Sequence, residues 1–146
     1  MIQKIKRLLR TYREQLLYLI FGVLTTVVDF SVSFLLYHFW LDATEAAVGM
    51  IHVADLIAWL AAVLFAYVTN RIWVFESKKS GVSAIAKELI GFAGGRVFTW
   101  LLQEAIIAVF VTALGLNKYL FRVLAAVLVV ILNYVISKLL VFKKET

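Results

Sequence analysis

The sequence predicts an all-α integral membrane protein, a bundle of four transmembrane helices. Hydrophobic residues make up 64% of the 146 residues, charged residues only 16%, and the mean hydropathy is +0.95. Soluble domains of this size are less apolar. The chain also holds four long apolar stretches. Each is long enough to cross a bilayer, which takes roughly 20 helical residues.

The predicted elements follow one another as a basic segment, two spans, a polar loop and two further spans. In residues 1–15, cations lie on one side of a helical pattern and apolar residues on the other. This segment is expected to be an interfacial helix on anionic phospholipid, or only the positive flank that orients the first span. All of residues 1–146 are expected to form a single membrane domain. The spans are predicted at 16–41, 48–75, 89–114 and 119–142, with the loop at 76–88.

The distribution of Lys and Arg predicts the topology. These residues gather before the first span, around the loop at 76–88 and after the fourth span, and are sparse in the other two connections. By the positive-inside rule, both termini and the central loop are expected in the cytoplasm. Both halves of the chain then enter the membrane in the same sense.

One sequence pattern occurs twice. AYVTNRIWVFE at 66–76 is matched by NYVISKLLVFK at 133–143, at a constant offset of 67 residues. Each copy ends an apolar run with a cation and an aromatic residue, as a membrane helix does where it reaches water. The repeat predicts two related helical hairpins, parallel rather than inverted. Matched pairs include Tyr67 with Tyr134, Asn70 with Ser137, Arg71 with Lys138, and Phe75 with Phe142.

Charged residues within the spans are the first candidates for function. A charge near the centre of a span costs about 2.5 to 3.5 kcal/mol and normally faces a partner or a wet cavity. We expect an inner cluster of Asp29 and Arg96 and an outer cluster around Asp55, Glu104 and Arg122. Together they would outline a polar track across the bundle. A structural ion pair explains Asp29 and Arg96 equally well, and Asp55 and Arg122 can snorkel to the interface.

Other residues indicate packing and exclude several function classes. Gly91 and Gly95 form a pair of small residues that predicts close helix packing. The sequence has no phosphate-binding P-loop, no HExxH and no cysteine, so we expect neither an enzyme nor a cofactor or metal site. The net charge of +6 comes from cations at the ends of spans, so a membrane surface is expected as partner and nucleic acid is not.

Four short motifs, in their order and spacing, resemble the GtrA-like family, and most closely its GtcA-type teichoic acid glycosylation members. The motifs are YLIFGVLTTVVDF, NRIWVF, RVFTWLLQEAI and NYVISKLLVF, within residues 15–143. The resemblance implies a protein of the bacterial cytoplasmic membrane that works with a membrane glycosyltransferase. Its implied role is to flip a polyprenyl-phosphate-linked sugar, with undecaprenyl phosphate as carrier, for glycosylation of a cell-envelope polysaccharide or teichoic acid.

Candidate substrate-binding residues follow from the motifs and from their chemistry. Cations suit the phosphate of a lipid carrier, and polar side chains suit its sugar. Ser137, where the first copy has Asn70, sets the two halves apart. One small bundle has little interior, so a homo-oligomer is expected. The residues carried over from the motifs are Asp29, Asn70, Arg71, Arg96, Asn133 and Lys138, and residue chemistry adds Gln103 and Glu104.

Two further functions remain open at this point. The chain would be a non-transporting subunit if its basic segment and central loop anchor or activate a polyprenyl-phosphate glycosyltransferase. It would be a small exporter of cations or drugs if its four helices enclose a buried acid. For that exporter, Arg96 and the interfacial cations are a weak point, because they suit an anionic ligand better.

Overall fold

The computed structural model describes residues 11–41 and 48–143. Within these ranges every regular element is a helix, and four helices are long and apolar enough to cross a membrane. The all-α, four-span prediction is therefore confirmed. Helices satisfy their own backbone hydrogen bonds, which a chain in lipid requires. The basic interfacial helix predicted at 1–15 falls mainly on residues 1–10, which lie outside the described residues.

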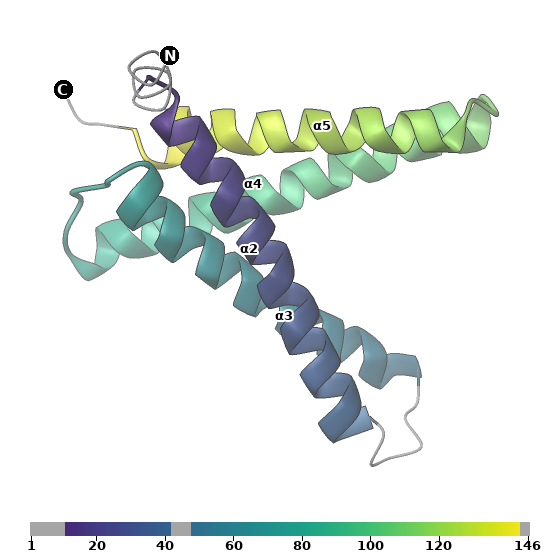
Figure 1. Cartoon of the computed structure of the whole chain (residues 1–146), viewed down its shortest axis with the longest axis horizontal. Helices are drawn as coiled ribbons and strands as arrows, with labels where there is room; N and C mark the ends of the chain where they lie inside the picture. The colour runs from purple at the N-terminus through teal and green to yellow at the C-terminus, as the bar shows by residue number, and fades with distance from the viewer. Residues whose placement is uncertain (1–10, 42–47, 144–146) are drawn as a thin grey trace, which may run out of the picture. The chain divides into compact units, whose positions relative to one another are not determined.

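The described helices form two units, Met1–Glu76 and Ser77–Thr146, and each unit is a helical hairpin (Figure 1). In the first unit α2 packs against α3, and in the second α4 packs against α5. A π-helical segment continues each helix at its C-terminal end. The elements are α2 (Arg13–Leu36), η1 (Tyr37–Leu41), α3 (Val48–Thr69), η2 (Asn70–Val74), α4 (Val82–Ile106), η3 (Ile107–Ala113), α5 (Lys118–Ile136) and η4 (Ser137–Val141).

Helix α4 begins at Val82, inside the stretch 76–88 that the sequence predicts to be a loop. The polar residues of this stretch suggested a water-exposed connection, but exposure to water does not prevent a helix. Residues 82–88, VSAIAKE, include alanine, lysine and glutamate, which favour helix. Gly81, with φ of +93°, supplies the backbone turn before the helix.

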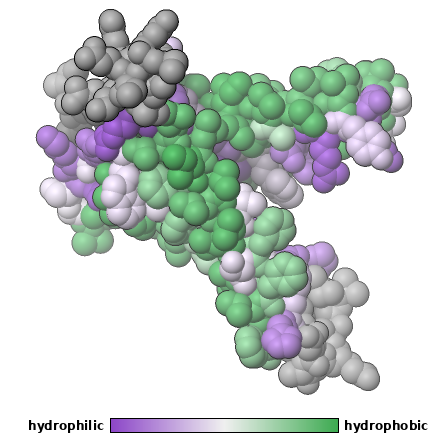
Figure 2. Space-filling view, in the orientation of Figure 1, coloured by the Kyte–Doolittle hydropathy of each residue, from purple (hydrophilic) through white to green (hydrophobic). Residues whose placement is uncertain are grey.

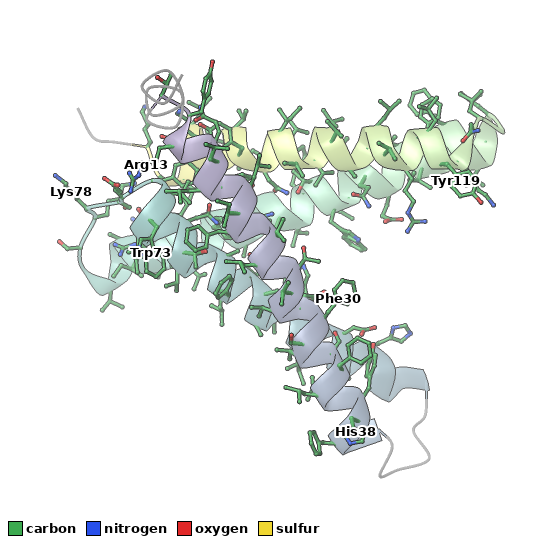
Figure 3. The ribbon with its side chains drawn as sticks, viewed as in Figure 1. Arg13, Phe30, His38, Trp73, Lys78 and Tyr119 are labelled. Atoms are coloured by element: carbon green, nitrogen blue, oxygen red, sulfur yellow. The ribbon has the colours of Figure 1, made fainter. Side chains whose placement is uncertain are left out.

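Small residues form the core of α3. Ala54, Ala58, Ala62 and Ala66 recur every four residues and are all buried. A row of small residues on one helix face permits close helix packing. Aromatic contacts then join α2 to η2, because the rings of Phe21 and Trp73 stack with centroids 5.5 Å apart. Figure 3 places Arg13 and Trp73 at one end of this hairpin and His38 at the other.

Glycines bring α4 and α5 together in the second hairpin. A Cβ atom at Gly95 would lie 2.9 Å from Cγ2 of Ile136, and one at Gly91 would lie 3.7 Å from Cγ2 of Val141. The close packing predicted from this glycine pair is therefore confirmed. Figure 2 shows hydrophobic residues over most of the helical surface in view, as expected for helices that face lipid.

Candidate functional site

The predicted site residues are divided between the two hairpins. Asp29, Asn70 and Arg71 belong to the first unit, and the other candidates belong to the second. A pair of Asp29 with Arg96 would join the two units and stays a prediction. Asn70 and Asn133 are buried, Asp29, Arg71, Arg96 and Gln103 are half-buried, and Glu104 and Lys138 are exposed.

A buried hydrogen bond links the two helices of the second hairpin. The hydroxyl of Thr99 on α4 donates to Oδ1 of Asn133 on α5 across 2.9 Å. Thr99 is 1% exposed and Asn133 6%. The close approach of α5 to Gly95, one turn before Thr99, makes this bond possible. Thr99 was not among the predicted site residues, although its position one turn after Arg96 on the same helix face is a signal that could have found it.

Arg96 lies over an aromatic ring. Its guanidinium carbon is 5.0 Å from the centroid of Phe92, which is buried. Phe92 in turn packs against Phe142, with ring centroids 6.0 Å apart. Within residues 77–143 Arg96 forms no ion pair. The guanidinium is thus held by a cation–π contact inside its own hairpin, and its N–H donors can bind an anion.

The remaining polar candidates of the second hairpin are spread along it. Gln103 lies two turns beyond Arg96 on the same face of α4, which corresponds to about 10 Å along the helix axis. Glu104 is rotated away from that face. Lys138 in η4 donates to the hydroxyl of Tyr134 across 3.0 Å. Lys138 and Tyr134 repeat Arg71 and Tyr67 of the first hairpin.

Asn70 carries a buried amide oxygen without a donor. Its Nδ2 donates to the carbonyl of Ala66 across 2.6 Å, which fixes the side chain. Its Oδ1 has no hydrogen-bond partner among the described residues, and the side chain is only 2% exposed. An unsatisfied buried polar group costs about 1 to 3 kcal/mol. A functional role is one explanation for a group of this kind.

Two acidic residues of the first hairpin lie on its two helices, Asp29 on α2 and Asp55 on α3. The hydroxyl of Tyr37 donates to the carboxylate of Asp55. The sequence placed Asp29 in an inner cluster and Asp55 in an outer one. Helices α2 and α3 pack against each other, and the division into an inner and an outer cluster stays a prediction.

The repeated segments have the same backbone structure. The N–H of Phe75 donates to the carbonyl of Asn70, and the N–H of Phe142 donates to that of Ser137, both across 2.8 Å. In each case the bond spans five residues, as in a π-helix. The rings also pack alike, since Tyr18 lies 6.3 Å from Phe75 while Phe92 lies 6.0 Å from Phe142. The sequence repeat thus reflects a structural repeat at the helix ends.

Glu88 is a buried acid that the sequence reasoning missed. It lies on α4 and is 3% exposed, and the hydroxyl of Ser77 donates to its Oε1 across 2.6 Å. The sequence prediction placed this residue in a water-exposed loop, where a glutamate is common and does not indicate a site. Because α4 already begins at Val82, Glu88 belongs to this helix, and its side chain lies in the interior of the hairpin.

Comparisons with known proteins agree with this architecture. Residues 17–142 match the family model described as GtrA/DPMS, transmembrane domain. The chain is 36% identical over 128 residues to the cell wall teichoic acid glycosylation protein GtcA of Listeria innocua, covering 88% of this chain and 83% of that protein. It is 34% identical over 129 residues to the uncharacterized membrane protein YwcD of Bacillus subtilis, covering 88% and 95%.

A GtcA protein of Listeria monocytogenes is 30% identical over 151 residues, which covers 99% of both chains. No solved structure matches significantly. The family match extends from the first span to the last, in agreement with four helices that can cross a membrane. The chain is therefore a multi-pass membrane protein that belongs to the GtrA/DPMS transmembrane domain family.

Proposed function

We propose that this protein translocates a polyprenyl-phosphate-linked sugar across the bacterial cytoplasmic membrane. The sugar would then be used to glycosylate teichoic acid or another cell-envelope polysaccharide. Membership of the family supports this role, as do the GtcA relatives, which are named cell wall teichoic acid glycosylation proteins. The carrier that fits is a lipid phosphate such as undecaprenyl phosphate.

The Oδ1 of Asn70, which has no hydrogen-bond donor among the described residues, carries the proposal. It is buried next to Arg71 in η2, a π-helical segment. A sugar hydroxyl can donate to the amide oxygen, and a phosphate can accept from the guanidinium. One ligand that offers both groups and a long apolar chain is a lipid-linked sugar.

Arg96 supplies a second cation of the required kind. Arginine binds phosphate through a planar fork of donors, and the ring of Phe92 holds this fork in place. A cation exporter would instead need its buried acids to face the transported ligand without competing cations. The half-buried guanidinium of Arg96 therefore favours an anionic ligand.

The proposal includes an arrangement in the membrane. The single domain of residues 1–146 has both termini and the loop after Glu76 in the cytoplasm, in line with its cations. It performs no chemical step itself and receives its substrate from a partner glycosyltransferase. Two or more copies assemble to widen the polar route.

The test is transfer of polyprenyl-phosphate-linked sugar between leaflets of liposomes that contain the purified protein. Arg96→Gln is expected to slow transfer by about tenfold or more, because a charge-assisted hydrogen bond is lost. Arg122→Gln is the matched control, since it removes an exposed cation from the same hairpin. A parent protein that transfers nothing, yet co-purifies with a glycosyltransferase and raises its activity, would show a non-transporting subunit instead.

A further inference from the structure

A pocket of about 580 Å³ lies within the second hairpin, away from Arg96 and Asn133. Its walls come from the loop before α4, the first turns of α4 and the end of η4. All its lining residues belong to one unit, so its shape is set by the packing of α4 against α5 and η4. None of the residues assigned above to the transported substrate lines it.

The charged residues of the pocket define the ligand that it fits. Lys79 and Lys87 line it, together with the carboxylate of Glu88, so the two cations outnumber the one acid. Ser80 and Ser83 add hydroxyl groups. A phosphate suits two ammonium groups, and hydroxyls on the ligand suit a carboxylate, whose two oxygens accept several hydrogen bonds. The lining therefore fits a phosphate ester that also carries hydroxyl groups.

The position of the pocket separates a lipid from a soluble phosphate. Val82 begins one candidate span and Val141 ends another, and both line the pocket. The pocket thus lies at the depth where lipid headgroups meet water. Leu140 also lines it and is 75% exposed. An exposed leucine beside the lysines gives a lipid chain an apolar surface, which a soluble phosphate would not use.

We propose that this pocket is a binding site for the phosphate-containing headgroup of an anionic membrane lipid. Lys79 and Lys87 hold the phosphate, Glu88 receives a headgroup hydroxyl, and the acyl chain leaves across Leu140. The backbone N–H groups at the start of α4 add donors at the same place, since Gly81 provides no side-chain cap. The site requires no transport activity, so it stands apart from the proposed function.

The test is binding of a defined lipid to the purified full chain, measured by native mass spectrometry over a concentration series. The probes are dioleoylphosphatidylglycerol, dioleoylphosphatidylcholine and soluble glycerol 3-phosphate. We expect the parent chain to bind phosphatidylglycerol in preference to phosphatidylcholine. Lys87→Gln should weaken the first phosphatidylglycerol site by about tenfold, the effect of one lost charge-assisted hydrogen bond.

Lys78→Gln is the matched control, because Lys78 is one residue from Lys79 but does not line the pocket. Figure 3 shows Lys78 on the loop at the end of the second hairpin, pointing away from the ribbon. Both variants remove one charge from the same surface. Binding within about twofold of the parent chain for Lys78→Gln would show that position, and not total charge, determines affinity.

Glu88→Gln gives a change of opposite sign. Glutamine keeps an oxygen that accepts from the headgroup hydroxyl but removes the negative charge beside the two lysines. Phosphatidylglycerol should therefore bind more tightly, and a loosened pocket would not produce such a gain. Equal loss for Lys87→Gln and Lys78→Gln would overturn the proposal in favour of diffuse surface attraction. Displacement of the lipid by glycerol 3-phosphate at equal concentration would overturn the assignment to a lipid. No sugar carrier is used, so either result leaves the transport proposal intact.

Discussion

A methyl group added at Gly95 tests the packing that positions Asn133. The new Cβ of Gly95→Ala would lie 2.9 Å from Cγ2 of Ile136, closer than carbon atoms approach in folded proteins. Either the Ile136 side chain or helix α5 must then move. Overpacking of this kind costs about 1 to 3 kcal/mol. Alanine recovers up to about 1 kcal/mol of helix propensity, so the expected net loss is roughly 0 to 2 kcal/mol.

Gly94→Ala is the control for that variant. Its Cβ would meet no atom within 4 Å, so the same substitution one residue earlier should only gain helix propensity. Unfolding of both variants is measured in one detergent by heat or by titration with SDS. Combination of Gly95→Ala with Ile136→Ala should couple favourably in a double-mutant cycle, because the second change removes the clashing methyl group. A Gly95→Ala protein as stable as Gly94→Ala would refute the reasoning.

Three other substitutions test separate contacts. Thr99→Val removes the donor to buried Asn133 and should lower the unfolding free energy by about 1 to 3 kcal/mol, measured by thermal unfolding. Asn70→Leu removes an unsatisfied buried oxygen, so unfolding should show unchanged or higher stability while the liposome assay shows lost transfer. Glu76→Gln breaks a 2.6 Å ion pair with Arg13, and chemical unfolding should change by less than about 1 kcal/mol because both side chains are more than half exposed.

The fold could be predicted because its causes lie in the local sequence. Apolar runs of sufficient length, and cations at their ends, follow from the solvent in which a membrane helix must reside. The repeat around Asn70 and Ser137 also shows in the sequence, and the matching ring contacts of Phe75 and Phe142 agree with it. The start of α4 at Val82 could not be predicted from the local sequence, because a polar stretch is compatible both with a loop and with an exposed helix.

The site was predicted only in part, because its contacts depend on how the helices pack. Arg96 and Asn133 were named as candidates because a polar group within a span is conspicuous, and their roles stay predictions. Thr99 and Glu88 were missed since a threonine is common in a span and a glutamate is common in a loop. Their burial and partners arise from the fit of α5 against Gly95 and from the fold of Ser77 onto α4.

The two hairpins share a scaffold but place their asparagines differently. Asn133 aligns with Ala66 of the first hairpin, and Asn70 aligns with Ser137 of the second, so the amides lie one helical turn apart along the repeat. In the second hairpin Thr99 donates to the amide oxygen, whereas the oxygen of Asn70 has no donor among the described residues. A paired amide locks two helices together at little net cost. An amide oxygen without a donor keeps its desolvation cost until a ligand supplies one. Under the proposed function, the first hairpin would therefore gain more free energy than the second from a hydrogen bond to a sugar hydroxyl.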